Sequence, residues 1–128
     1  MDSDVLVVDD SAAIRKILTR VLRQTGMAIQ TIHEAGDGQE ALAVMALHRI
    51  DLVLSDINMP KMDGLQLLAS LKTSPQYQKI PVVMITTEGG ETKVAEAVRL
   101  GAAGYVRKPF TADQIKEKLM GILGTAVA

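Results

Sequence analysis

Short runs of apolar residues alternate along this chain with segments in which apolar residues recur every three or four positions. The first run covers residues 5–8, and the segment that follows it has apolar residues at helical spacing: Ile14, Ile17, Leu18, Val21 and Leu22. A short continuous apolar run is typical of a strand buried on both faces, whereas the wider spacing puts an apolar stripe along one helix. The pattern predicts a strand, a loop and an amphipathic helix, with Gly26 just past the helix end.

The same unit is repeated four more times. Further strands are predicted at residues 29–34, 52–54, 81–85 and 105–106, and each is followed by a helical pattern. Residues 37–40 and 111–114 have the form of capping boxes that open the second and fifth helices, and Gly124 is expected to end the last one. Five strand–helix units with short loops predict an α/β fold in which a parallel sheet is covered on both faces.

The polarity of each strand predicts its place in the sheet. The runs that begin near Val5, Leu52 and Val82 are wholly apolar and should be central, whereas those at Ile29 and Tyr105 are mixed and should be edges. The doubly wound order 2-1-3-4-5 meets both conditions and puts the topological switch point between the first and third strands.

Composition narrows the classes of protein. The length of 128 residues suits one domain, residues 1–128 without an effector domain, and the net charge of −1 offers no field that would attract nucleic acid or an anionic membrane. The absence of cysteine excludes disulfides and thiolate metal sites. Because no apolar run approaches about 18 residues, we expect a soluble, cytoplasmic protein. We also expect a monomer.

Polar side chains follow the predicted strands at one edge of the sheet: Asp9 and Asp10, Asp56, Thr86, and Lys108. At an effective dielectric constant of about 20, carboxylates a few ångströms apart would repel by several kcal/mol per close pair unless a cation lies among them. Oxygen ligands without His or Cys favour Mg²⁺ over zinc. The sequence therefore predicts a magnesium site at the carboxyl edge.

The charges of this site favour phosphoryl transfer. The three carboxylates, one Mg²⁺ and Lys108 sum to zero, so the pocket can accept a phosphoryl group whose oxygens need cations and hydroxyl donors. Asp56, in the middle, is the expected nucleophile and would become an aspartyl phosphate. We expect Asp9 and Asp10 to hold the metal with Asp56 and a backbone carbonyl near Asn58, and Lys108 and Thr86 to contact the phosphoryl oxygens.

Four motifs together resemble the receiver domain of two-component response regulators, a flavodoxin-like (βα)5 fold. They are Val-Val-Asp-Asp-Ser at 7–11, Ser-Asp-Ile-Asn-Met-Pro at 55–60 with Asp63-Gly64, Ile-Thr-Thr at 85–87, and Gly-Tyr-Val-Arg-Lys-Pro-Phe at 104–110. The resemblance covers almost the whole chain. It implies that Asp56 takes a phosphoryl group from a histidine kinase in the presence of Mg²⁺, and that the Lys108–Pro109 bond is cis.

The resemblance also implies a signalling switch rather than an enzyme, with only self-catalysed phosphotransfer and autodephosphorylation. Thr86 and Tyr105 occupy the switch positions, whose movement remodels the surface around the fourth helix and fifth strand. Asn58, Thr87 and Glu88 flank the phosphoryl site and should modulate its lifetime.

The output partner is the open question in this resemblance. Tyr105, Glu88 and the Lys-Pro-Phe run favour a chemotaxis regulator whose target is the flagellar motor switch, with a phosphatase as a further partner. A phosphorelay intermediate, a phosphate sink and a sporulation-type receiver share these features and stay as alternatives.

Two other classes of protein use related folds. A haloacid dehalogenase-like phosphatase needs an acid two residues after its nucleophile, where this chain has Asn58, and usually carries a cap insertion. A flavodoxin-like FMN module needs a Ser/Thr/Gly phosphate loop and aromatic residues, but aromatics make up only 2% of this chain. Neither class is favoured.

The remaining candidates have structural interpretations. His33 and His48 are expected to lie far apart and away from the acidic edge. Met45, Met84 and Met120 are placed at core spacing. Lys93 and Arg99 are expected on a solvated helix face, with a partner surface as the alternative.

Overall fold

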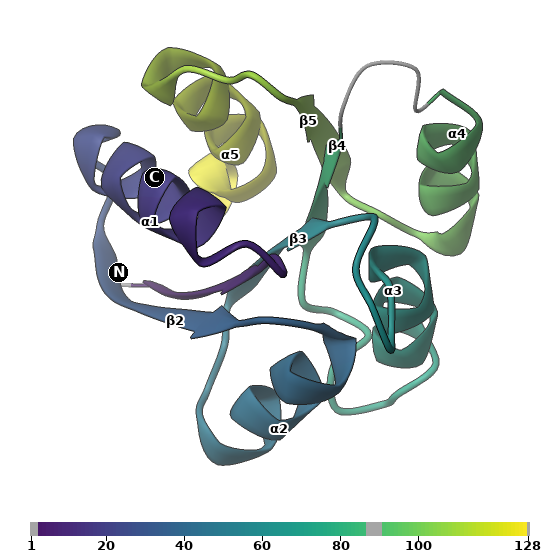
Figure 1. Ribbon diagram of the computed structural model, residues 1–128. Coiled ribbons are helices and arrows are strands. Elements are labelled where there is room, and N and C mark those ends of the chain that lie inside the picture. Colours follow the sequence, from purple (N-terminus) through teal and green to yellow (C-terminus); the bar gives the residue numbers. More distant parts are fainter. Residues whose placement is uncertain (1–2, 87–90, 128) are drawn as a thin grey trace.

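Five strands and five helices alternate along the chain in the computed structural model, which describes residues 3–86 and 91–127 (Figure 1). The elements are β1 (Ser3–Val8), α1 (Ala12–Gln24), β2 (Ile29–Ala35), α2 (Gly38–Leu47), β3 (Leu52–Asp56), α3 (Gly64–Lys72), β4 (Val82–Thr86), α4 (Glu91–Leu100), β5 (Gly104–Arg107) and α5 (Ala112–Val127). The predicted succession of five strand–helix units is confirmed. None of the described helices is both long and apolar enough to cross a lipid bilayer.

The strands form one parallel sheet in the order β2-β1-β3-β4-β5, which confirms the predicted topology. Every residue of β3 and β4 is buried, as are residues 5–8 of β1, whereas β2 and β5 carry exposed positions. A parallel strand covered on both faces needs apolar residues at every position, and an edge strand does not. Strand composition therefore predicts strand position.

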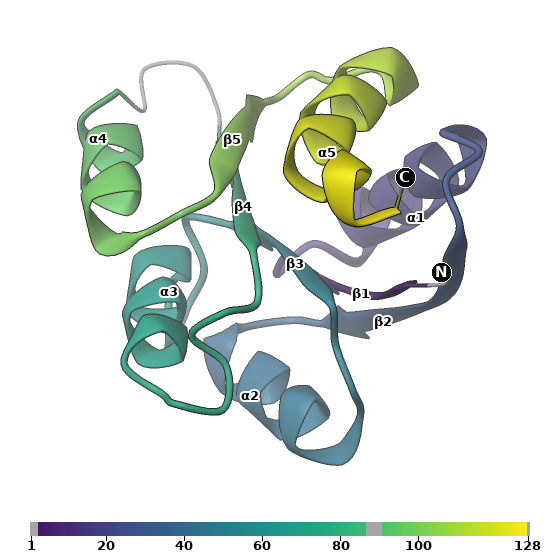
Figure 2. The ribbon, with the colours of Figure 1, turned by 180° about the vertical axis from the view of Figure 1, so that it is seen from behind.

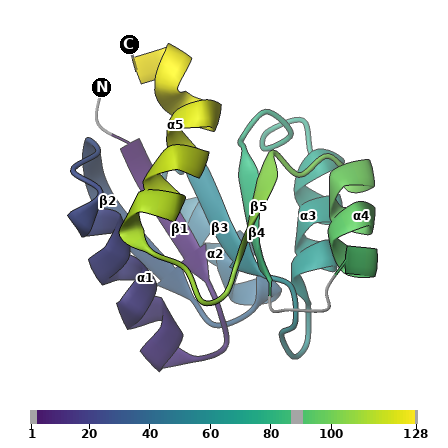
Figure 3. The same cartoon turned by 90° about the horizontal axis from the view of Figure 1, so that it is seen from above.

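The sheet separates two apolar cores. Helices α1 and α5 cover one face, and α2, α3 and α4 cover the other (Figures 2 and 3). Because successive strand side chains point to opposite faces, Val53 packs in the core beneath α2, α3 and α4, while its neighbours Leu52 and Leu54 pack in the core beneath α1 and α5.

Side chains cap the helix starts. Asp63 accepts a hydrogen bond of 2.9 Å from Gln66 N–H and donates its own N–H to Gln66 Oε1 at 3.0 Å, a complete capping box on α3. The predicted box at residues 111–114 is also complete. At residues 37–40 only one half is formed in the described structure, where Asp37 accepts from Glu40 N–H. Gly26 follows α1 with a φ of +74°, as a residue past a helix end often requires.

Three details of the helices differ from the sequence predictions. Helix α5 continues to Val127 rather than ending at Gly124, since a glycine costs a helix only about 1 kcal/mol. Met120 is 50% exposed and Ile17 of the predicted apolar stripe is 42% exposed, whereas Met45 and Met84 are buried as predicted. The seam of α4 against the sheet is narrow, and Ala97 is its one buried residue among those described.

The prediction that the histidines lie far apart is wrong. The rings of His33 in β2 and His48, the residue after α2, have centroids 4.4 Å apart and are tilted by 30°. Helix α2 runs back along the sheet beside β2, so its last turn returns to the strand that precedes it (Figure 1). The two rings therefore lie in contact rather than on separate parts of the surface.

Candidate functional site

The carboxyl ends of the parallel strands lie at one edge of the sheet (Figure 3), and the predicted site residues come at these ends. Asp9 follows β1, Asp56 is the last residue of β3, Thr86 is the last residue of β4, and Lys108 follows β5. The switch between β1 and β3, which lie side by side, puts the two acidic loops next to each other.

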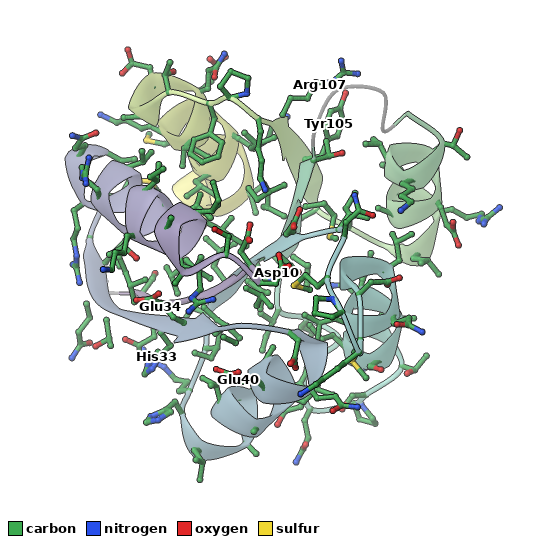
Figure 4. The ribbon with its side chains drawn as sticks, viewed as in Figure 1. Asp10, His33, Glu34, Glu40, Tyr105 and Arg107 are labelled. Atoms are coloured by element: carbon green, nitrogen blue, oxygen red, sulfur yellow. The ribbon has the colours of Figure 1, made fainter. Side chains whose placement is uncertain are left out.

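The three predicted carboxylates form a cluster. One oxygen from each of Asp9, Asp10 and Asp56 lies within 4.8 Å of the others. Asp9 and Asp56 are buried, at 1% and 8% exposure, while Asp10 is exposed and lies near the middle of the sheet edge in Figure 4. The cluster is closed at its base and open to solvent on the Asp10 side.

Lys108 completes the charged site. Its Nζ lies 3.2 Å from Asp9 Oδ2 and 3.5 Å from Asp56 Oδ1, and its side chain is largely buried. The peptide bond from Lys108 to Pro109 is cis, as the sequence resemblance implies. The Lys108 N–H donates to the carbonyl of Thr86 at 2.7 Å, so β4 and the residue after β5 are held together at the site.

Backbone donors orient two of the carboxylates. Asp56 Oδ1 accepts a hydrogen bond of 3.0 Å from Ile57 N–H, and Asp9 Oδ1 accepts one of 2.9 Å from Ser11 N–H. Each side chain thus folds back on the loop that it begins. This fixes the carboxylates before any ligand arrives.

Burial raises the pKa of Asp56, and the charge of Asp9 raises it further, while Lys108 and the Ile57 N–H partly oppose both effects. The environment therefore favours an added positive charge beside Asp56. Three clustered carboxylates with oxygen ligands alone are the donor set that fits Mg²⁺. Asp9, Asp10 and Asp56 could hold such an ion.

Gly64 lets helix α3 start directly against the end of β3. A Cβ at this position would lie 2.2 Å from the carbonyl oxygen of Asp56 and 2.8 Å from the Cα of Ile57. The Gly64 N–H also donates to the Ile57 carbonyl at 2.8 Å. Only glycine fits so close to the backbone of Asp56 and Ile57.

A shallow cavity of about 310 Å³ lies beside the cluster. It is lined by Asp10, Asn58, Met59, Pro60 and Asp63. Its walls come from the loop after β1 and the loop after β3, so a small molecule in it would lie next to Asp10. The cavity gives the acidic cluster an entrance.

Two basic residues of the site were not predicted from the sequence. Arg15 in α1 donates from Nη1 to the Asp9 carbonyl at 2.6 Å and pairs through Nε with Glu34 at 3.0 Å. Lys93 in α4 donates from Nζ to Asn58 Oδ1 at 2.5 Å. Both residues lie in the first turns of helices that start at this edge, and this position was the available signal in the sequence. Helical spacing alone does not distinguish such a residue from one that is exposed to solvent.

The remaining predicted residues are placed in part. Thr86 is buried at the site, and Asn58 is exposed on its rim. Tyr105 points outward from β5, with Lys118 Nζ 5.6 Å from its ring centre, and Figure 4 shows it on the outer side of the strand. Thr87 and Glu88 lie outside the described residues. The Asn58 carbonyl as a metal ligand stays a prediction.

Comparisons with known proteins agree with this geometry. The family model described as "Response regulator receiver domain" matches residues 5–120. The Helicobacter pylori chemotaxis protein CheY1 is 40% identical over 94% of this chain and 97% of its own length, and a Campylobacter jejuni chemotaxis protein CheY homolog is 38% identical over 94% and 92%. The structure of the chemotaxis response regulator CheY4 of Vibrio cholerae superposes with a TM-score of 0.85, at 34% identity, over 96% of this chain and 100% of that one.

The chain belongs to the response regulator receiver domain family. Its resemblance is to the CheY type, the chemotaxis receivers of two-component signalling. Proteins of this family bind Mg²⁺ at an acidic cluster of the kind formed here by Asp9, Asp10 and Asp56.

Proposed function

We propose that this protein is a phosphoacceptor switch in which Asp56 receives a phosphoryl group from a histidine kinase. The observation that carries the proposal is the cluster of Asp9, Asp10 and Asp56, with Lys108 beside Asp9 and Asp56, at the switch point of a receiver fold. A buried carboxylate beside two others and one lysine is suited to accept an anionic group once a cation is added.

Asp9, Asp10 and Asp56 would hold Mg²⁺, with the Asn58 carbonyl as a further ligand. When bound, the ion supplies positive charge to the phosphoryl oxygens. Lys108 would provide a second positive charge, since its Nζ lies 3.5 Å from Asp56 Oδ1, and Thr86 would provide a hydroxyl donor at the end of β4.

The transfer step needs no proton from the receiver. A carboxylate oxygen of Asp56 bonds to phosphorus while the bond from phosphorus to the imidazole nitrogen of the kinase breaks, and the electron pair of that bond returns to the nitrogen. Water later hydrolyses the acyl phosphate and restores the carboxylate. Asn58, Thr87 and Glu88 would modulate that hydrolysis, so the protein catalyses only its own modification.

The output surface would be formed by α4, β5 and α5, and Thr86 and Tyr105 would couple it to Asp56. Three large apolar residues of these elements are exposed, namely Val98, Tyr105 and Met120. A groove of about 520 Å³ lies between β5 and α5. Exposed apolar residues beside a groove are typical of a surface that binds another protein.

The proposed setting is chemotaxis, with the flagellar motor switch as target and a phosphatase as a further partner. Support comes from the relatives named as chemotaxis proteins, which this chain matches over 92% and 97% of their own lengths. A cytoplasmic location is part of the same proposal. A phosphorelay intermediate or a phosphate sink is the alternative role for the same chemistry.

Intact mass after incubation with acetyl phosphate tests the acceptor assignment. Wild type with Mg²⁺ should gain one phosphoryl group, which hydroxylamine removes, while Asp56→Asn or the omission of Mg²⁺ should prevent the gain. The assignment fails if wild type never gains mass or if Asp56→Asn gains it equally.

A further inference from the structure

Lys93, near the start of α4, contacts the loop that follows the acceptor strand. Its Nζ donates to Asn58 Oδ1 at 2.5 Å, across 35 positions of sequence. This hydrogen bond connects α4 to the loop after β3. Since Asn58 comes two residues after Asp56 and lines the cavity beside the acidic cluster, Lys93 is hydrogen-bonded to a residue of that cavity.

The cavity that the partner of Lys93 lines carries acidic side chains. Asn58 lines the entrance cavity together with Asp10 and Asp63. The partner of Lys93 is a neutral amide, so this hydrogen bond does not neutralise the charge of the lysine. A phosphoryl oxygen is a stronger acceptor for an ammonium than an amide oxygen is, because both donor and acceptor are then charged.

The packing of α4 leaves Lys93 free to change partner. The side chains of Thr92, Lys93 and Glu96 are exposed, and the helix is anchored through Ala97. The flexible four-carbon stem of a lysine can turn without displacing a buried residue. An exchange of Asn58 for a ligand would therefore leave the core beneath α4 intact.

We propose that Lys93 recognises the phosphoryl dianion of a small acyl phosphate in the entrance cavity, and that Asn58 holds it there in the resting protein. The inference rests on the proposed function, since the bound phosphoryl group is the one that Asp56 takes. With acetyl phosphate, the Asp56 oxygen bonds to phosphorus, the bond from phosphorus to the acetyl oxygen breaks, and acetate leaves with the electron pair. Lys93 contacts the phosphoryl oxygens throughout and transfers no proton.

The rate of phosphorylation by acetyl phosphate, followed by intact mass, tests this role in wild type, Lys93→Gln, Lys93→Arg and Arg99→Gln. Arg99 is the matched control because it is an exposed cation on the same helix. Lys93→Gln should raise the donor concentration for half-maximal rate by roughly 3- to 10-fold and leave the maximal rate unchanged, since one nearby charge is lost. Lys93→Arg should retain most of the effect and Arg99→Gln should behave as wild type.

Salt separates recognition by charge from a structural role. At about 1 M salt, where the Debye length falls to about 3 Å, the difference between Lys93→Gln and wild type should shrink towards none. Equal losses in Lys93→Gln and Arg99→Gln, or a loss confined to the maximal rate, would overturn the proposal.

A second measurement does not depend on phosphotransfer. The side-chain amide resonances of Asn58 should shift in resting Lys93→Gln relative to wild type, and inorganic phosphate with Mg²⁺ should shift them in wild type but not in the variant. If wild type fails to gain a phosphoryl group, the proposed function fails while these shifts still test Lys93. Resonances that are unaffected by the substitution and by phosphate would exclude the contact.

Discussion

Asp56 is held where its charged form is disfavoured, although the proposed chemistry needs that form. Burial and the neighbouring Asp9 raise its pKa above the ordinary value of 3.8. The unfolded chain therefore releases this proton at a lower pH than the folded protein does. As pH rises through the interval between the two pKa values, the free energy of unfolding falls, and it stays lower above that interval.

Replacing Asp56 with asparagine should remove this loss. In EDTA at neutral pH, Asp56→Asn is expected to have a higher free energy of unfolding than wild type, and the difference should disappear below the ordinary carboxyl pKa. Urea denaturation across pH measures it. Saturating Mg²⁺ should reverse the ranking, because wild type gains binding energy that the variant lacks. A variant that is less stable than wild type in EDTA at neutral pH would contradict the expectation.

Gly64 offers a second test at the scale of one residue. Gly64→Ala should lower the free energy of unfolding by about 1 to 3 kcal/mol or more, because the new Cβ would overlap the backbone of Asp56 and Ile57. Gly121→Ala in α5 is the matched control, since a Cβ at that position would have no atom of the described structure within 4 Å apart from its own stretch of helix. That substitution should stabilise by roughly 0.5 to 1 kcal/mol. Equal effects of the two would contradict the close approach at Gly64.

Residue by residue, the sequence was most informative where a polar side chain ends an apolar strand. Asp9, Asp56 and Lys108 could be placed together because parallel strands finish at one edge. Lys93 and Arg15 could not, because a helix turns its residues through every direction and the spacing of polar residues does not say which one meets a loop. Their contacts depend on where the helix axis lies.

At the scale of elements, the start of α3 serves both the fold and the site. Asp63 closes the capping box on this helix and also lines the entrance cavity. Thr111 closes the equivalent box on α5, away from that cavity. The two caps have the same chemistry in different surroundings.

Alanine at either cap should lower the free energy of unfolding by about 1 kcal/mol. Only Asp63→Ala should also shift the backbone resonances of Asp10 and Asn58, which share the cavity with it. Urea denaturation and amide spectra of the two variants test this together. Shifts at Asp10 in Thr111→Ala would show that the cavity senses α5 as well.

The existence and order of the elements followed from periodicity, but their lateral packing did not. Helical spacing correctly put Leu18 and Leu22 of α1 in a core. It also suggested an inward Ile17 and Met120, which are 42% and 50% exposed. The width of a buried stripe depends on the neighbouring helices, and a single pattern does not contain that information.

For the whole molecule, the acidic edge should make stability depend on the metal. Mg²⁺ at about 100 times its dissociation constant should raise the free energy of unfolding of wild type by about 2.7 kcal/mol if it binds the folded state alone. Asp10→Asn should lose most of that increment. Its free energy of unfolding without Mg²⁺ should stay close to that of wild type, since Asp10 is exposed. Thermal unfolding with Mg²⁺ and with EDTA gives both values. An undiminished increment in Asp10→Asn would place the ion elsewhere.

Because the sheet separates two cores, substitutions in one core during evolution should be largely independent of substitutions in the other. Val53 and Leu54 are neighbours in the chain but pack on opposite sides of the sheet, so changes in their sizes should accumulate independently. Leu18 and Ile115 come from opposite ends of the chain and share one core, so a larger side chain at one calls for a smaller one at the other. Among related sequences, the core positions should therefore form two groups that vary together within each group, and residues of the two groups should alternate along the central strands.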